Sequence, residues 1–228
     1  MRKCRFNSGR RYYITYMSMQ SRYNEVVLKT AREIFNSIKH CKTSYQKDID
    51  LAEYHGIPKQ GAKKDPRFIL DLLMEIDLYI KYDTDIPWSH NISAQADQVK
   101  PSDAIAMIEG KITVNPNFLP VAYNDILAEI KEMLRHELEH ITQGKTGKLQ
   151  YQKYRQISYN KYLVLRHEIP AYMYGLYTRA KTKRMTVTQA LEEWYTENKN
   201  NFDSPSDWPA VKQIWMDWGM QYLPNAKW

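Results

Sequence analysis

The sequence has few of the features that mark secreted, disulfide-stabilised or membrane-embedded proteins. Only two of its 228 residues are cysteines, Cys4 and Cys41, too few for a disulfide framework or a cysteine-based structural zinc site. No segment approaches the roughly 20 consecutive apolar residues that a membrane helix needs, and the first residues lack the apolar stretch of a secretory signal peptide. We therefore expect a protein of the reducing cytoplasm that does not associate with membranes.

Acidic residues are absent from the first 23 positions, which carry six arginines and lysines. This segment therefore holds +6 of the net charge of +7, and the rest of the chain is close to neutral. A nucleic-acid-binding protein would instead interleave basic residues along one face of its fold, so nucleic-acid binding is disfavoured. We expect residues 1–23 to form a basic arm that is docked against a partner or the domain.

Residues 24–228 are expected to form one domain, because no repeat, low-complexity tract or long linker divides them. Apolar residues at helical spacing predict two early helices, around residues 26–38 and 68–80. Residues 83–102 are rich in Pro, Ser, Asp and Asn and predict a loop, with an extended stretch near 86–92.

A change of pattern follows at residues 104–114. Two apolar or β-branched stretches lie on either side of Glu109-Gly110, which predicts a small antiparallel hairpin. The sequence then becomes helical again, in four segments at about 123–144, 151–182 with a break near Pro170, 187–199 and 208–222. The predicted class is α+β, mainly helical, with a small antiparallel sheet or hairpin before these helices.

The most specific motif is H-E-x-x-H, formed by His136, Glu137 and His140. Two histidines four residues apart project from one face of a helix and can bind one tetrahedral Zn²⁺, while the glutamate between them faces the metal-bound water. The alternative is a pair of surface histidines. The apolar stripe along the same helix and the preceding hairpin favour the zinc site.

A catalytic zinc site needs a third protein ligand and an open fourth position. The metzincin pattern places a histidine six residues after the second one, where this chain has Thr146, so that pattern does not apply. Further along the chain, His167 and Glu168 are both candidates. Glu168 follows His140 by 28 residues, which leaves room for a loop and a returning helix.

These residues resemble the gluzincin branch of the zincin metallopeptidases, to which thermolysin belongs, over roughly residues 104–180. The resemblance implies a zincin-like domain in which Glu168 is the third ligand, with the small residue Ala171 three positions later. It also implies that an extended peptide substrate pairs with an edge strand before the motif helix, which we place at residues 104–114. Thermolysin-like enzymes use an Asp behind the ligand Glu to orient a histidine, whereas this chain has Tyr172 in that neighbourhood.

A looser resemblance links the chain to small predicted peptidases encoded by bacteriophages. It rests on the Glu168-Ile-Pro-Ala-Tyr172 segment and on a Trp-rich closing helix at 208–222. The expected function is therefore zinc-dependent peptide hydrolysis, with one Zn²⁺ on His136, His140 and Glu168 and with Glu137 as general base. Candidates for stabilising the oxyanion or for supporting the ligands are His167, Tyr159, Tyr162 and Tyr172.

A second hypothesis comes from a different class of function. The chain would be a non-catalytic or latent zincin-fold protein of a larger assembly, such as a phage virion. The basic arm 1–23 and the Trp-rich helix 208–222 would then contact protein partners. Core packing is the competing explanation for the tryptophans of that helix.

Overall fold

A computed structural model describes residues 24–39, 45–50, 73–99, 105–143 and 157–228. The predicted basic arm 1–23, the first part of the helix predicted at 68–80, and Thr146 lie outside these residues. None of the helices in the described ranges is both long and apolar enough to cross a membrane.

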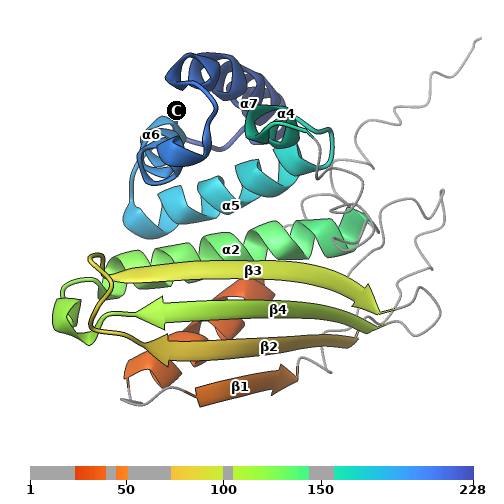
Figure 1. Cartoon of the computed structure of the whole chain (residues 1–228). Coiled ribbons are helices and arrows are strands. Elements are labelled where there is room, and N and C mark those ends of the chain that lie inside the picture. Colours follow the sequence, from red (N-terminus) through yellow and green to blue (C-terminus); the bar gives the residue numbers. More distant parts are fainter. Residues whose placement is uncertain (1–23, 40–44, 51–72, 100–104, 144–156) are drawn as a thin grey trace, which may run out of the picture.

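The first half of the chain builds a four-stranded sheet in the order β1-β2-β4-β3 (Figure 1). β2 and β4 are parallel to each other, and both β1–β2 and β3–β4 are antiparallel. The sheet is therefore mixed, with β3 at one edge. The strands are β1 (Tyr45–Asp50), β2 (Leu73–Tyr82), β3 (His90–Val99) and β4 (Ile105–Val114).

Three sequence predictions for this half of the chain are wrong. Residues 73–82 form a strand instead of the end of a helix, and the predicted loop at 83–102 contains β3. The predicted hairpin is one continuous strand, because Glu109-Gly110 pairs in register with residues on both neighbouring strands. β4 is thus an interior strand, and the edge strand expected at 104–114 is β3 instead.

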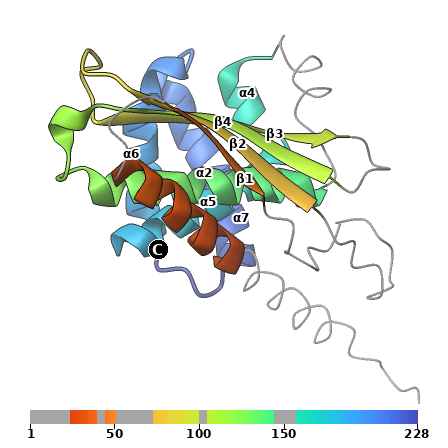
Figure 2. The same cartoon turned by 90° about the horizontal axis from the view of Figure 1, so that it is seen from below.

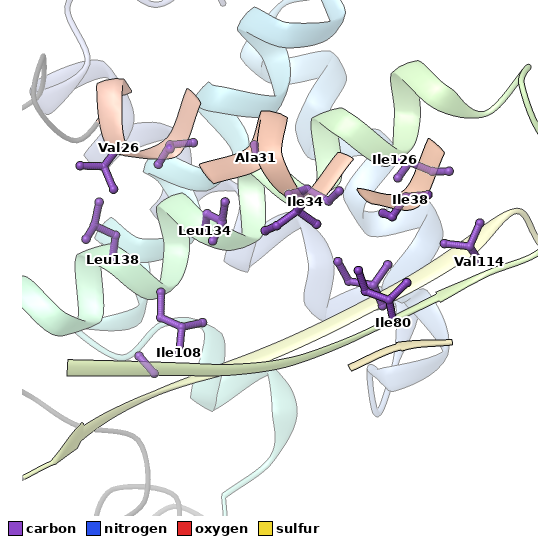
Figure 3. Close-up of a cluster of buried hydrophobic side chains, with 14 of the residues drawn as sticks. Val26, Ala31, Ile34, Ile38, Ile80, Ile108, Val114, Ile126, Leu134 and Leu138 are labelled. Atoms are coloured by element: carbon purple, nitrogen blue, oxygen red, sulfur yellow. The ribbon is translucent and has the colours of Figure 1, made fainter. Parts of the chain in front are cut away.

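Among the described residues, helices cover one face of the sheet and leave the other exposed. Ile80, Ile108 and Ile112 are buried, whereas Tyr79 and Lys111 are exposed, as alternation along a strand requires. The helix of residues 24–39, predicted from its periodicity, lies on the covered face together with α2 (Tyr123–Gln143) (Figure 2). Their apolar side chains and those of the strands form the first core (Figure 3).

Helix α2 has apolar residues four apart, and this spacing turns one stripe toward the sheet. Ile126, Ile130, Leu134 and Leu138 are all buried in the first core. The opposite side of α2 contacts α5 (Glu168–Lys183), so α2 lies between the sheet and the remaining helices (Figure 1). The motif residues therefore lie on a helix that is packed on two sides.

The second half of the chain is helical. α5 begins at Glu168, two residues before Pro170, and a start at this place agrees with the predicted break because proline is tolerated in the first turn of a helix. The tryptophans of α6 and α7 form a second core against α5, which confirms the packing explanation for Trp208 and Trp215. The other elements of this half are α4 (Tyr159–Leu163), α6 (Val187–Asn198), η2 (Lys199–Asn201), η3 (Pro205–Asp207) and α7 (Trp208–Tyr222), while η1 (Pro116–Phe118) precedes α2. The mainly helical α+β class is confirmed.

Candidate metal site

The site forms where α2 and α5 approach each other closely. A Cβ atom on Gly175 of α5 would lie 3.0 Å from the backbone oxygen of Glu132 and 3.6 Å from the Cβ of His136, so only glycine fits without displacement. Gly175, Ala171 and Glu168 are spaced by four and three residues and share one face of α5. The small residues let α5 bring Glu168 up to the histidines.

Three side chains converge on one point. The Nε2 atoms of His136 and His140 are 3.0 Å apart, and Glu168 Oε2 lies 3.8 Å from the first and 3.3 Å from the second. Ligands placed about 2.1 Å from a tetrahedral zinc ion are roughly 3.4 Å from one another. The three observed separations lie on both sides of this value, so the group could hold one metal ion.

Glu168 supports this interpretation through one buried carboxylate oxygen. Its Oε2 is buried and makes no hydrogen bond of good geometry to any described residue. A buried carboxylate oxygen left in this way is costly, and a cation between the three ligands would satisfy it. Burial alone would raise the pKa of Glu168, but contacts with His140 and His167 outweigh burial and hold the pKa below its usual range, so the carboxylate is ionised.

The two histidines differ in their protonation. Burial, followed by the neighbouring His140, lowers the pKa of His136 to about 3, so this imidazole is neutral, the form that binds metals. Burial is the largest single influence on His140 and lowers its pKa, but Glu168, Glu137 and Glu139 together outweigh burial and hold the pKa above its usual value. A metal ion would therefore compete with a proton for His140.

Glu137 lies outside the group of three ligands and points toward the sheet. Its Oε2 accepts a 2.8 Å hydrogen bond from the backbone N–H of Ala96, in the middle of β3. Burial raises the pKa of Glu137 to about 7, the range in which a general base works well at neutral pH. The motif helix thus places a carboxylate with a raised pKa between the metal ligands and the edge strand.

His167 and Glu168 were both candidates for the third ligand, and the structure places Glu168 in the ligand group. His167 directs its Nε2 at the other oxygen of Glu168, Oε1, at 3.3 Å. This contact can orient the carboxylate of Glu168 so that Oε2 faces His136 and His140. His140 and His167 have ring centroids 6.2 Å apart, so His167 borders the site.

The tyrosines that the sequence could not rank occupy different places. Tyr172 contacts the ring of His136, with centroids 4.5 Å apart. Tyr162 lies near the carboxylate of Glu168, and Tyr159 lies near Tyr172. All three therefore border the site, and Tyr162 is the one beside the third ligand.

The sequence analysis missed two elements that support the site. The first is Ala96 on β3, which the alternation of Ile92, Ala94 and Ala96 would have indicated. The second is His90 at the start of β3, which bonds Glu129 of α2 at 2.7 Å and so fixes the strand to the motif helix.

Comparison with models of known families, with curated proteins and with solved structures finds no match for this chain. The interpretation of the site therefore rests on the residues and their geometry.

Proposed function

We propose that this protein is a zinc-dependent metallopeptidase of the gluzincin type. The observation that carries the proposal is the convergence of His136, His140 and Glu168 on one point, with Glu137 beside them. Two imidazoles and one carboxylate, with a fourth position left for water, are the donor set of catalytic zinc sites. The buried Oε2 of Glu168, which makes no hydrogen bond of good geometry, supports a cation at this place.

The chemistry divides between the metal and Glu137. When bound, zinc supplies a Lewis acid that polarises the scissile carbonyl and makes water more acidic. Glu137 takes a proton from the attacking water and then delivers it to the leaving amine, so that one carboxylate serves as base and then as acid. Its pKa of about 7 suits both steps, because it can be deprotonated before attack and protonated before the amine leaves.

The edge of β3 supplies a surface for an extended peptide. Ala96 directs its N–H toward Glu137, away from β4, and in an antiparallel pair the residues two positions away point in the same direction. The main-chain groups of Ala94 and Gln98 therefore face the same side. A substrate strand pairing there would gain main-chain hydrogen bonds next to the general base.

The test is peptide cleavage by the zinc-loaded wild type beside zinc-loaded Glu137→Gln. Glutamine keeps an oxygen that can accept the Ala96 hydrogen bond, so the variant removes the base without removing the contact. We expect cleavage of an unstructured protein or peptide library by the wild type, lowered by about 10²- to 10⁴-fold in the variant at equal zinc content. Equal rates in both proteins, or a zinc-loaded wild type that cleaves nothing, would refute the peptidase.

One observation favours a second function, a latent or non-catalytic zincin-fold protein of a larger assembly. The carboxylate of Glu137 is already hydrogen-bonded to the strand along which a substrate would lie. Since Trp208 and Trp215 are buried, contacts of α7 with a partner would use its exposed Ile214, Met220 and Tyr222 instead. One bound zinc per chain without any peptide cleavage would favour this function. The larger assembly could then be a phage virion.

A further inference from the structure

We propose that Tyr172 is a positioning residue of the metal site, whose ring holds the imidazole of His136 in its ligand orientation. The inference rests on the proposed metal site but does not depend on peptidase activity. It assigns to an aromatic ring the orienting task that a hydrogen-bonding partner usually performs for a metal-binding histidine.

The first observation is the contact between the two rings. Tyr172 and His136 have centroids 4.5 Å apart and planes at 74°, an edge-to-face arrangement at the close end of the favourable range. His136 also meets the ring of His140, at 4.7 Å and 79°. The imidazole of His136 is thus bounded by a second ligand and by Tyr172.

The second observation is that Tyr172 is itself held firmly. Its ring stacks on Trp215 at 4.8 Å and 20° and meets Trp194 edge-on at 5.4 Å. Trp215 is fully buried, and its indole N–H donates a 2.9 Å hydrogen bond to the backbone oxygen of Leu163. The second aromatic core therefore supports Tyr172 from behind and fixes the surface that His136 contacts.

The hydroxyl of Tyr172 has separate neighbours. It lies near the side chain of Tyr159, which in turn lies near Asn201. The ring of Tyr172 contacts His136, whereas its hydroxyl interacts with Tyr159, Tyr162 and the carboxylates of Glu168 and Glu137. Removing the hydroxyl alone therefore separates positioning by the ring from oxyanion stabilisation, because only the second role needs the oxygen.

The experiment measures zinc affinity by competition with a chelator, and records the visible spectrum of the Co²⁺-loaded protein. The variants are Tyr172→Phe, which keeps the ring, and Tyr172→Leu, which removes it. Tyr195→Leu is the matched control, because Tyr195 stacks on Trp208 at 4.8 Å in the same core and belongs to α6, which contributes no ligand.

We expect Tyr172→Phe and Tyr195→Leu to bind zinc within about twofold of wild type. Tyr172→Leu should bind about 10- to 100-fold more weakly, with a changed Co²⁺ spectrum. Should Tyr172→Leu not fold, Tyr172→Met fills the space with a flexible side chain and carries the same expectation.

Unchanged affinity in Tyr172→Leu, or equal losses in the Phe and Leu variants, would overturn the positioning role while leaving the metal site intact. A wild type that binds neither zinc nor cobalt would overturn the metal site and this inference together.

Discussion

A larger side chain in place of Gly175, where α5 contacts α2, should lower both the stability of the fold and the affinity of the site for zinc. Contacts of a Cβ atom become ordinary at about 3.4 Å, whereas a Cβ here would meet the Glu132 backbone oxygen at 3.0 Å. The neighbouring helix would have to retreat by 3.4 − 3.0, or about 0.4 Å. Because the obstacle is main-chain oxygen, the helices themselves must move apart.

The expected loss of stability can be estimated for Gly175→Val. Overpacking costs about 1–3 kcal/mol, and replacing a helical glycine returns roughly 0.3–0.5 kcal/mol. A net loss of about 0.5–2.7 kcal/mol lowers Tm by roughly 1–11 °C in a chain of this length. Glu168 lies two turns away on the same face of α5, and a ligand shift of a few tenths of an ångström should weaken zinc binding by about tenfold.

The assay combines thermal unfolding of the metal-free protein with a zinc competition titration. Ala210→Val is the control, because it makes a similar change at an exposed position of α7 and should alter Tm by at most a degree or two. If Gly175→Val kept both the Tm and the zinc affinity of the wild type, close packing at Gly175 would not position Glu168, and this reasoning would be refuted.

Three further outcomes are expected. Zinc at about 1,000 times its Kd should stabilise the wild type by about 4 kcal/mol, raising Tm in a scanning experiment by roughly 8–16 °C, with no such rise in His140→Ala. His90→Ala should lower the free energy of unfolding in urea by about 1–3 kcal/mol, because it leaves Glu129 unpaired, whereas an unchanged midpoint would show that the contact does not stabilise the fold. In the metal-free protein, burial raises the pKa of Glu137 from 4.5 to about 7, so the native state retains a proton that the unfolded state loses between these pH values, and stability falls as the pH rises through this window. Glu137→Gln should make this fall in the free energy of unfolding smaller by up to about 3 kcal/mol. An identical pH dependence of stability in both proteins would contradict the raised pKa of Glu137.

The candidate site could be predicted from the sequence because its constraints are local. His136, Glu137 and His140 need only a helix, and the buried stripe of Ile126, Ile130 and Leu134 predicts that helix strongly. The choice between His167 and Glu168 needed the structure. Adjacent residues in a chain point in different directions, and only the packing of α5 on α2 decides which one meets the histidines.

The sheet was predicted poorly because its pairing is not local. Ile76 and Ile80 in β2 are four residues apart and fit a helix as well as a strand, and only the neighbouring strands decide between the two. Gly110 in β4 resembled a turn, although a glycine inside a strand needs no reversal of the chain. β3 was mistaken for a loop because its buried residue Ala96 is small.

The edge strand shows how one error followed from another. A hairpin predicted at residues 104–114 makes this segment the nearest candidate for an edge strand before the motif helix. The actual edge strand, β3, is fixed to that helix by His90–Glu129 and by Ala96–Glu137. Such contacts between residues about 40 positions apart leave no periodic pattern in the sequence.

Zinc content tests the central claim most directly. Wild type, His140→Ala, Glu168→Ala and Glu137→Gln would be loaded with zinc, dialysed against metal-free buffer and measured by elemental analysis. We predict about one zinc per chain in the wild type and in Glu137→Gln, and a loss of zinc in the two ligand variants. A wild type that retains no zinc, or ligand variants that retain as much as the wild type, would contradict a metal site at His136, His140 and Glu168.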